Sequence, residues 1–306
     1  MKKRYLPETE IELSPIVLGC MRLTKQTKDQ ATKYIESVAD LGINFFDHAD
    51  IYDGGKCEEL FGAALKSSSL KREDLFIQTK CGIVPGKMYD LSAKHIIESV
   101  EGSLKRLHTD YIDSLLLHRP DALVEPEEVA DAFNQLATAG KVRFFGVSNH
   151  NPMQIELLKK YVCQPLMINQ LQFGPAHSAM IAQGLEVNMD TAGAVNRDGS
   201  VVEYCRANDI LMQAWSPFQR GFIAGPFFDD PAYANLTATL EKLGQAQGCT
   251  ATTMTAAWIL RHPANFQVIT GTMNLQHLQE IAAATQVNLS RSQWYEIYTS
   301  AGNLLP

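Results

Sequence analysis

Several features are missing from this sequence, and each absence narrows the classes of protein that it can encode. No two of the six cysteines, at positions 20, 57, 81, 163, 205 and 249, form a Cys-x-x-Cys pair. This spacing disfavours a zinc site or a disulfide framework, so we expect reduced cysteines and no metal. No apolar run approaches the roughly 20 residues that cross a bilayer. With no secretory signal at the start, the chain is expected to be cytoplasmic, without a membrane partner.

Positive charge is also scarce. The 27 Lys and Arg residues are outnumbered by 34 Asp and Glu residues, which gives a formal net charge of −7. The longest basic run is Lys2, Lys3 and Arg4, and we interpret it as a solvated terminus. An acidic surface disfavours nucleic acid as a partner. The oligomeric state cannot be read from these features.

The 306 residues contain one unit that repeats: a short β-rich apolar run followed by a longer amphipathic segment. Eight runs are the number that a closed parallel barrel needs. The sequence therefore predicts an α/β fold, a single-domain (β/α)8 TIM barrel over residues 1–306. An open doubly wound sheet is the alternative, but no Gly-x-Gly-x-x-Gly follows the first run. The runs are residues 16–21, 43–48, 75–80, 112–118, 142–148, 166–172, 210–215 and 266–270.

The amphipathic segments between the runs are predicted helices. Ser92 and Pro126 are typical helix starts, and Gly140 is a typical helix end. Residues 173–199 show no clear element, and residues 216–234 are rich in glycine and proline. Both segments follow strands, so we expect loops at the carboxyl rim, where barrel active sites lie. The predicted helices are residues 29–41, 92–107, 126–139, 152–161, 201–208, 236–246, 252–261 and 275–285.

Polar side chains gather where three of the apolar runs end. Asp47 and Tyr52 close or follow the second run, Lys80 ends the third and His118 the fourth. A buried lysine needs an anion, and Asp47 is the expected partner. The alternative is a purely structural ion pair beside an ordinary core histidine. Four polar groups converging from adjacent strands favour a catalytic site.

These residues and their neighbours resemble the aldo-keto reductase family. Residues 46–52 (FDHADIY) are similar to the family's FDTAxxY block, and residues 116–120 (LLHRP) to its LLHxPD block. Residues 145–149 (FGVSN) are similar to GVSN, and residues 215–218 (WSPF) to YSPL. The resemblance spans nearly the whole chain. The long segment after the sixth run and the ending at residues 294–298 (WYEIY) are similar to the bacterial YdhF-like branch.

The resemblance implies a reductase that transfers hydride from a nicotinamide cofactor to an aldehyde or ketone. Asp47, Tyr52, Lys80 and His118 match the family's catalytic tetrad. Tyr52 is then the proton donor, and a nearby Lys80 cation is expected to lower its pKa toward the working range. Asp47 would hold Lys80, and His118 would orient the carbonyl.

The cofactor site follows from the same resemblance. Ser148, Asn149 and Gln170 are expected to hold the carboxamide, with Trp215 stacked on the nicotinamide ring. No arginine follows the eighth run where NADPH-selective members carry a basic residue, so NADPH is expected from the family's habit and NADH stays open. Residues expected near the pyrophosphate are Ser216, Pro217, Phe218, Arg220 and Gly221, and those near the adenosine are Gly271, Thr272 and Asn274. The carbonyl substrate is not identified; candidate pocket walls are His48, Tyr89, Phe173 and Met189.

Two other functions stay open. Lys80 at a strand end could form a Schiff base with a carbonyl substrate, as in class I aldolases, although pairing with Asp47 argues against it. The chain could instead be a cofactor-binding, redox-sensing subunit of a partner protein, as some relatives of the family are for ion channels. Such subunits carry a long N-terminal segment, whereas the first strand is expected here by about residue 11.

Overall fold

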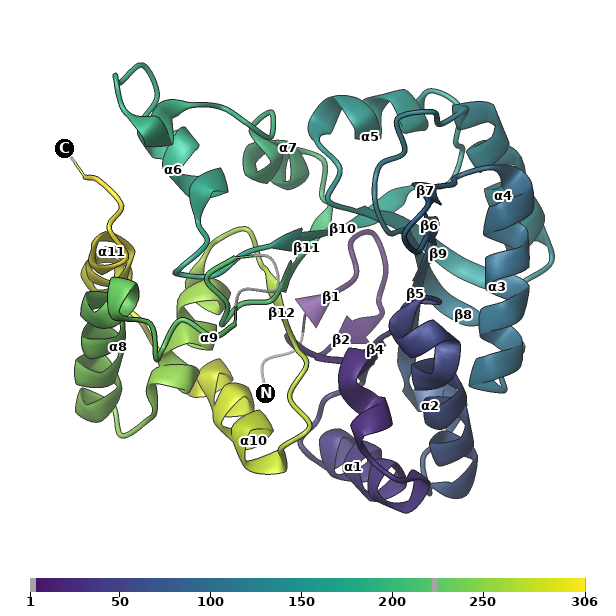
Figure 1. Ribbon diagram of the computed structural model, residues 1–306, viewed down its shortest axis with the longest axis horizontal. Helices are drawn as coiled ribbons and strands as arrows, with labels where there is room; N and C mark the ends of the chain where they lie inside the picture. The colour runs from purple at the N-terminus through teal and green to yellow at the C-terminus, as the bar shows by residue number, and fades with distance from the viewer. Residues whose placement is uncertain (1–3, 222–224, 306) are drawn as a thin grey trace.

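The computed structural model describes residues 4–221 and 225–305. Its centre is a closed barrel of parallel strands surrounded by helices (Figure 1). The predicted (β/α)8 barrel is confirmed, and each predicted apolar run supplies one barrel strand. Lys2 and Lys3 of the basic run lie outside the described residues. The barrel strands are β3 (Ile16–Gly19), β4 (Phe45–Asp47), β5 (Phe76–Cys81), β8 (Ile112–Leu117), β9 (Val142–Ser148), β10 (Leu166–Gln172), β11 (Leu211–Trp215) and β12 (Gln267–Thr270).

Side chains alternate between the inside and the outside of the barrel, as the two-residue period of a strand requires. On β5, Phe76 belongs to the interior apolar cluster, whereas Ile77 belongs to the cluster under the helices. Every residue of β5 is buried, because the barrel fills one face and helices cover the other. The strand therefore shows no alternation of buried and exposed residues.

The helices begin and end largely at the predicted signals. Ser92 caps its helix by accepting from the backbone N–H of His95 at 3.3 Å, and Pro126 stands in the first turn of the next one. Gly140 follows that helix with φ 68°. The helices are α1 (Lys28–Asp40), α2 (Lys56–Ser67), α3 (Ala93–Leu107), α4 (Pro126–Thr138), α5 (Pro152–Lys159), α6 (Ala179–Leu185), α7 (Val201–Ala207), α8 (Ala234–Ala246), α9 (Ala251–Arg261), α10 (Leu275–Ala283) and α11 (Arg291–Ser300).

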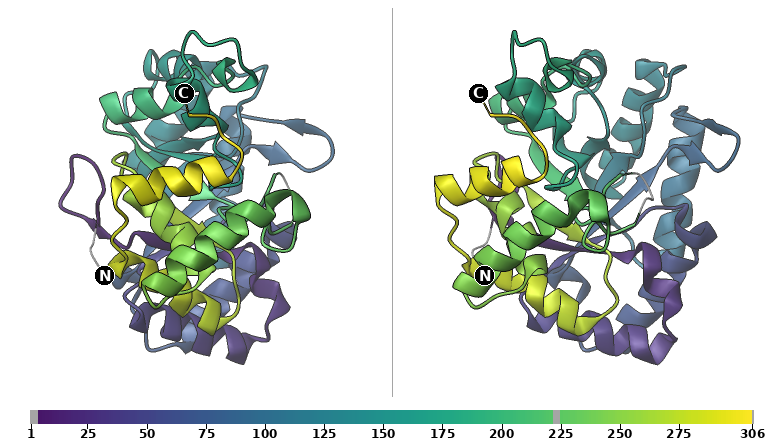
Figure 2. Two further views of the ribbon diagram at one scale, coloured as in Figure 1. Left: turned by 90° about the vertical axis from the view of Figure 1, so that its left-hand side faces the viewer. Right: turned by 60° about the vertical axis from the view of Figure 1, so that its left-hand side comes forward.

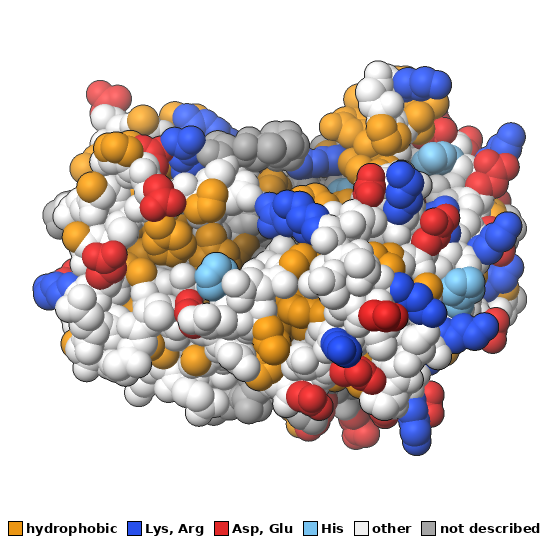
Figure 3. All heavy atoms as spheres, turned by 60° about the horizontal axis from the view of Figure 1, so that its bottom comes forward, with side chains coloured by type: hydrophobic (Ala, Val, Ile, Leu, Met, Phe, Trp, Pro, Cys, Tyr) orange, Lys and Arg blue, Asp and Glu red, His pale blue; other side chains and the backbone are white. Residues whose placement is uncertain are grey.

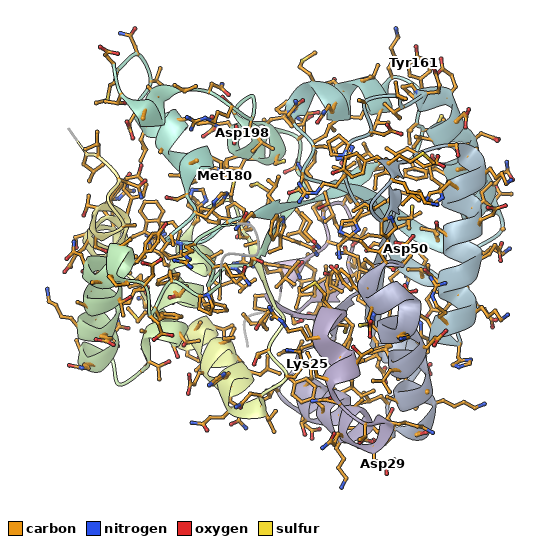
Figure 4. The ribbon with its side chains drawn as sticks, viewed as in Figure 1. Lys25, Asp29, Asp50, Tyr161, Met180 and Asp198 are labelled. Atoms are coloured by element: carbon orange, nitrogen blue, oxygen red, sulfur yellow. The ribbon has the colours of Figure 1, made fainter. Side chains whose placement is uncertain are left out.

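Three of these helices were not predicted. α2 follows Gly55, whose φ of 92° starts the helix without a capping side chain, so the usual start signal is absent. α6 lies within residues 173–199, where no element was expected, and buries Met180 against the body of the protein (Figure 4). With seven residues and no side-chain cap, it depends on that packing.

α11 was seen in the sequence only as a family-like ending, and the structure explains its aromatic residues. The rings of Trp258 on α9 and Trp294 on α11 stack at 4.8 Å with an angle of 9° between their planes. Each indole N–H donates to the other residue's backbone oxygen, at 3.0 and 3.1 Å. This reciprocal pair attaches the last helix beside α8 and α9 (Figure 2).

Two short hairpins add to the barrel. β1 (Arg4–Tyr5) and β2 (Glu12–Leu13) bring Leu6 and Leu13 onto Phe45, Phe76 and other residues at the amino ends of the strands. This hairpin closes the end of the barrel opposite the polar strand ends. The second hairpin, β6 (Ile83–Val84) with β7 (Met88–Tyr89), projects from the body after β5 (Figure 2).

All six cysteines are free thiols, as predicted. Cys163 is exposed. None of the helices in the described ranges combines the length and apolar character that crossing a bilayer demands. Acidic and basic side chains are interspersed on the face drawn in Figure 3, with apolar atoms around its central hollow.

Gly146 tests how tightly β9 is held against its neighbours. A Cβ atom there would lie 2.6 Å from the backbone oxygen of Ile168 and 2.7 Å from a methyl carbon of Leu116. We expect Gly146→Ala to lower the free energy of unfolding by about 1–3 kcal/mol, because strand and core must shift. Urea denaturation measures this change. The control is Gly184→Ala in α6, where the nearest atom is the flexible Glu203 carboxylate at 3.2 Å; equal destabilisation by both substitutions would contradict the prediction.

Candidate active site

The pairing of β4 with β5 determines where the tetrad residues lie. Asp47 ends β4 opposite Gln78. The chain then continues along β5: His48 N–H donates to the Gln78 oxygen at 2.8 Å, and Asp50 N–H to the Lys80 oxygen at 3.1 Å. A short 3-10 turn, η2 (Tyr52–Gly55), follows and returns Tyr52 to Lys80.

The Lys80 ammonium group is the centre of the site. Its Nζ donates to Asp47 Oδ2 at 2.8 Å, to the backbone oxygen of His48 at 2.7 Å and to Tyr52 Oη at 3.0 Å. An ammonium has three protons, so each has an acceptor. The residue is fully buried. Burial alone would lower the pKa of Lys80, but Asp47 and Tyr52 raise it above its usual value. A lysine held as a cation disfavours the Schiff-base alternative.

Tyr52 accepts its hydrogen bond from Lys80, so its own proton stays free for another acceptor. Burial raises the pKa of Tyr52; Lys80 lowers it and Asp47 raises it again, and the net pKa lies above its usual value. Lys80 lowers the pKa of Tyr52 as expected, but desolvation of the phenolate outweighs the cation, so the net pKa does not fall toward the working range. The phenol therefore holds its proton at neutral pH.

His118 follows β8 and faces Tyr52 edge-on, with ring centroids 6.2 Å apart. Burial, together with the positive charges of Lys80 and Arg119, lowers the pKa of His118 to about 2. The imidazole is therefore neutral and has one N–H to donate. Its Nδ1 is buried and has no hydrogen-bond partner among the described residues.

The residues expected at the carboxamide lie together on β9, β10 and β11. Ser148 Oγ donates to the Gln170 backbone oxygen at 3.0 Å, and Asn149 Nδ2 donates to Ser148 Oγ at 2.8 Å. Trp215 Nε1 donates to Asn149 Oδ1 at 3.1 Å. Asn149 adopts φ 59°, a left-handed conformation that asparagine tolerates better than most residues. The Arg119 guanidinium carbon lies 5.8 Å from the centroid of the Trp215 ring.

The residues expected at the phosphates lie in two loops. Ser216 adopts φ 48°, and the Pro217 oxygen lies so close to Gly174 that a Cβ there would be 2.2 Å away. Phe218 stacks on Phe228 at 6.4 Å. Arg220 forms an ion pair with Asp230, so its charge is shared within this loop. Gly221 is the last described residue before the gap in the described chain.

The loop after β12 contains a basic neighbour that the sequence analysis missed. Arg22, in η1 (Cys20–Lys25) after β3, donates from Nη1 to the Gly271 oxygen at 3.2 Å. Tyr34 donates to the Thr272 oxygen at 2.7 Å, and Asn274 caps α10 by accepting from two backbone N–H groups. No arginine follows the eighth apolar run in the sequence. Because the first and last strands pair when the barrel closes, Arg22, which follows the first strand, lies beside the loop after β12.

Of the four candidate pocket walls, two are wrong. His48 is fully buried and packs edge-on against Phe61, with 4.6 Å between ring centroids. Phe173 is fully buried and packs against Trp258. Successive residues of a strand point to opposite faces, and the neighbours of both residues face the barrel interior. The side chains of His48 and Phe173 therefore point outward and lie under the helices. Tyr89 is exposed and Met189 half-buried.

The donor set fits a nicotinamide dinucleotide. A half-buried indole, a group of buried and half-buried amide and hydroxyl side chains, and a guanidinium beside the loop after β12 match an aromatic amide ring joined to phosphates. The described residues contain no group of three or more His, Cys, Asp or Glu side chains placed to hold a metal. Two surface hollows lie elsewhere, one beside Cys163 and one beside Arg291, and neither includes a tetrad residue.

A second polar cluster lies behind the tetrad, outside the barrel. Glu58 on α2 is buried and accepts from Thr79 Oγ1 at 2.6 Å and from Arg106 Nε at 2.8 Å. Burial and the negative charge of Glu58 raise the pKa of Asp50 to about 6. Asp50, labelled in Figure 4, lies in the segment that leads to Tyr52, and its Oδ1 has no partner among the described residues.

A closed parallel barrel with a polar site at the carboxyl ends of its strands defines a barrel enzyme. The model of the Aldo/keto reductase family matches residues 15–300. A 6-dehydroglucose reductase of Agrobacterium fabrum is 36% identical, with 98% of each chain covered. Oxidoreductase YdhF of Escherichia coli is 33% identical over 95% of this chain and 94% of its own. The crystal structure of the thermostable aldo-keto reductase Tm1743 with the inhibitor epalrestat superimposes with a TM-score of 0.79 at 26% identity, covering 98% of this chain and all of that one.

The chain therefore belongs to the aldo/keto reductase family, and it is an oxidoreductase. The family generally uses NAD(P)H. The resemblance found in the sequence motifs, including the likeness to YdhF, is confirmed.

The raised pKa of Asp50 predicts that removing its carboxyl group increases the free energy of unfolding, by an amount that depends on pH. The folded state keeps this proton up to pH about 6, whereas the unfolded carboxyl loses it near 3.8. The folded state thus binds more protons in this window, and wild-type stability falls as pH rises through it. Asp50→Asn should gain stability relative to wild type between pH 4 and pH 7, by up to about 3 kcal/mol. Urea denaturation across this range measures the difference.

Glu36→Gln is the control with the opposite sign. The backbone N–H and hydroxyl of Ser69 lower the pKa of Glu36. Its carboxylate therefore contributes stability above its unfolded pKa, and that stability is lost as pH falls. The variant should be less stable than wild type at neutral pH and approach it in acid. A difference between Asp50→Asn and wild type that does not change with pH would show that Asp50 ionises normally.

Proposed function

We propose that the protein reduces an aldehyde or ketone to an alcohol, with NADPH as the hydride source and Tyr52 as the general acid. The observation that carries the proposal is the hydrogen bond from the buried Lys80 ammonium to Tyr52 Oη at 3.0 Å. It leaves the phenol proton free for a substrate oxygen, and it places a cation where the phenolate would form.

Proton transfer begins from a protonated phenol. Tyr52 holds its proton at neutral pH because its pKa is raised by burial. As the carbonyl oxygen gains electron density, the phenol proton moves to it and the O–H bond of Tyr52 breaks. Lys80 stabilises the resulting phenolate, and Asp47 keeps Lys80 in place. A proton from solvent then restores the phenol.

His118 acts as a neutral hydrogen-bond donor beside the phenol. Its pKa of about 2 keeps the imidazole uncharged throughout the working range. A neutral N–H orients the carbonyl oxygen without competing with Tyr52 to transfer a proton. The buried Nδ1 without a partner among the described residues supports a role in binding an added group.

The cofactor supplies a hydride to the carbonyl carbon when it is bound. Ser148, Asn149 and Gln170 hold its carboxamide, and Trp215 stacks on its ring. The loop from Ser216 to Gly221 approaches the pyrophosphate. Arg22 adds positive charge beside the loop after β12, which favours NADPH because a guanidinium pairs well with a phosphate.

The substrate is a small carbonyl compound, and we propose sugar carbonyls as the first class to test. The support is the name of the relative at 36% identity, a 6-dehydroglucose reductase. Turnover on a panel of aldehydes and oxidised sugars also distinguishes the alternative, a redox-sensing subunit that binds the cofactor with little turnover. Activity at the cofactor background across the panel would favour that alternative.

Tyr52→Phe tests the general acid. The variant loses only the hydroxyl, so cofactor binding should remain within about threefold of wild type while kcat falls by at least about a hundredfold. Steady-state rates with NADPH and a reducible aldehyde measure the loss. Tyr89→Phe removes a phenol from the exposed β7 hairpin and is the control. Near-normal turnover in Tyr52→Phe would exclude Tyr52 as the acid.

Tryptophan fluorescence tests the cofactor and its contact with Trp215. Titration with NADPH should quench emission at lower concentration than titration with NADH. The chain has three tryptophans, and Trp258 and Trp294 are buried in their stack, so Trp215→Phe should remove most of the quenching. Arg22→Gln should weaken NADPH binding by roughly tenfold, the effect of one charge-assisted hydrogen bond. Quenching that survives Trp215→Phe unchanged would contradict the stacking.

A further inference from the structure

A hollow in the helical layer outside the barrel concentrates positive charge. It lies among α6, α7, α9 and α11, in the left half of Figure 1, and has a volume of about 330 Å³. This volume is at the lower end of the range for small-molecule sites. The charged residues of its lining are Arg206, Arg261, Arg291 and Glu203, which give a formal charge of +2. The whole chain has a formal charge of −7, so this hollow runs against the general charge of the protein.

The guanidinium groups of the hollow have no carboxylate partners within the described chain. Arg206 and Arg291 are exposed and form no hydrogen bond or ion pair with the described residues. Arg261 Nε donates to the backbone oxygen of Leu289 at 2.7 Å, which leaves its two Nη groups without a partner among those residues. Other arginines pair with carboxylates, as Arg106 does with a buried glutamate. Like charges in one hollow repel each other, and an anion bound between them relieves that repulsion.

His262, which also lines the hollow, adds a neutral hydrogen-bond donor. Its Nδ1 accepts from the backbone N–H of Ala264 at 3.2 Å, so Nδ1 carries no proton. Burial, together with the positive charges of Arg206 and Arg261, lowers the pKa of His262 to about 4, and the ring is neutral at neutral pH. Its one proton is therefore on Nε2. That atom has no partner among the described residues, and it is not among the atoms sealed from solvent.

The rest of the lining is largely apolar. Ile181 and Leu185 come from α6, and Trp294 and Tyr295 come from α11. Leu185 is exposed although it is apolar, and the ring of Trp294 is held by its stack on Trp258. A few convergent donors among apolar walls are the usual composition of a small-molecule site. The hollow therefore suits a ligand that has an anionic group at one end and an apolar body at the other.

We propose that this hollow binds a phosphate monoester with a small apolar body. A phosphate monoester has a charge of about −1.5 to −2 at neutral pH and three acceptor oxygens, which match the charge and the donors of the hollow. Guanidinium groups also bind phosphate through paired hydrogen bonds. A carboxylate has one charge and two oxygens, so it leaves more of the donors unused. The proposal is independent of the proposed function, because no tetrad or expected cofactor residue lines the hollow.

The test uses phenyl phosphate as the probe and isothermal titration calorimetry as the measurement. Ionic strength is held constant, because salt screens exposed charges. Wild type should bind the probe with a dissociation constant of roughly 1 mM or lower. Inorganic phosphate lacks the apolar body and benzoate has a single charge, so each should bind at least about threefold more weakly. Absence of saturation up to about 10 mM phenyl phosphate, or equal affinity for either comparison ligand, would overturn the proposal.

Substitutions of opposite sign locate the probe in the hollow. Arg206→Gln and Arg291→Gln each remove one positive charge, and each should weaken phenyl phosphate binding by about threefold or more, the effect of an exposed charge-assisted contact. Glu203→Gln removes the negative charge of the lining and should strengthen binding by about threefold. All three side chains are exposed and form no hydrogen bond with the described residues, so the fold should be unaffected.

Arg197→Gln is the matched control. Arg197 is exposed in the loop between α6 and α7 and does not line the hollow, so its loss changes the net charge equally without changing the site. Affinity for phenyl phosphate should stay at its wild-type value. Weakening equal to that of Arg206→Gln would show a general attraction to the surface and overturn the proposal. Unchanged affinity in both Arg206→Gln and Arg291→Gln would place the probe elsewhere and overturn it as well.

Discussion

The buried ammonium group of Lys80 is the constraint on which the rest of the site depends. An unpaired charge in a barrel interior costs several kcal/mol, so each of its three protons must have an acceptor. The acceptors come from consecutive parts of the chain: Asp47 ends β4, His48 provides its backbone oxygen and Tyr52 opens η2. A one-residue slip of β4 against β5 would separate all three from Nζ, because strand neighbours face opposite sides. The charge of one side chain thus holds the register of two strands and the position of the phenol.

The barrel tolerates this polar centre because its interior is layered. At the amino end, the hairpin residues Leu6 and Leu13 close an apolar layer that keeps water out. Above it, buried glutamine amides from β5, β10 and β11 donate to one another, to a glutamine of β12 and to Asp47, and leave few polar atoms without partners. Buried polar networks stabilise a unique structure when every member is bonded, and they are costly when one is not. At the open end, among the described residues, His118 Nδ1 is buried without a hydrogen-bond partner.

Much of this arrangement was predictable from sequence, for reasons of spacing along the chain. Asp47 and Tyr52 are five residues apart and stand in a familiar motif, and Lys80 ends an apolar run, so their convergence follows from strand ends meeting at one rim. Arg22 and Gly271 are 249 residues apart, and their contact exists only because the first and last strands pair on closure. Gln213 and Gln267 were read as parts of apolar strands, since no local pattern shows that buried amides will face each other. α2 was missed because a glycine backbone, not a side chain, starts it.

Burial acts on two neighbouring groups in opposite chemical directions but with one electrostatic result. Burial raises the pKa of Tyr52, so the phenol stays protonated, and it lowers the pKa of His118, so the imidazole stays unprotonated. Both side chains are therefore neutral. Among the described residues, the tetrad charges that act on the phenol are then those of Lys80 and Asp47, which compensate each other. In the proposed reaction new charge appears only as the phenol proton leaves, next to a cation that is already fixed and desolvated. Such a cation stabilises the phenolate without reorganisation, whereas water molecules would have to reorient their dipoles around the new charge. The desolvation that makes the resting phenol a weaker acid also makes Lys80 more effective, because both arise from the same low dielectric.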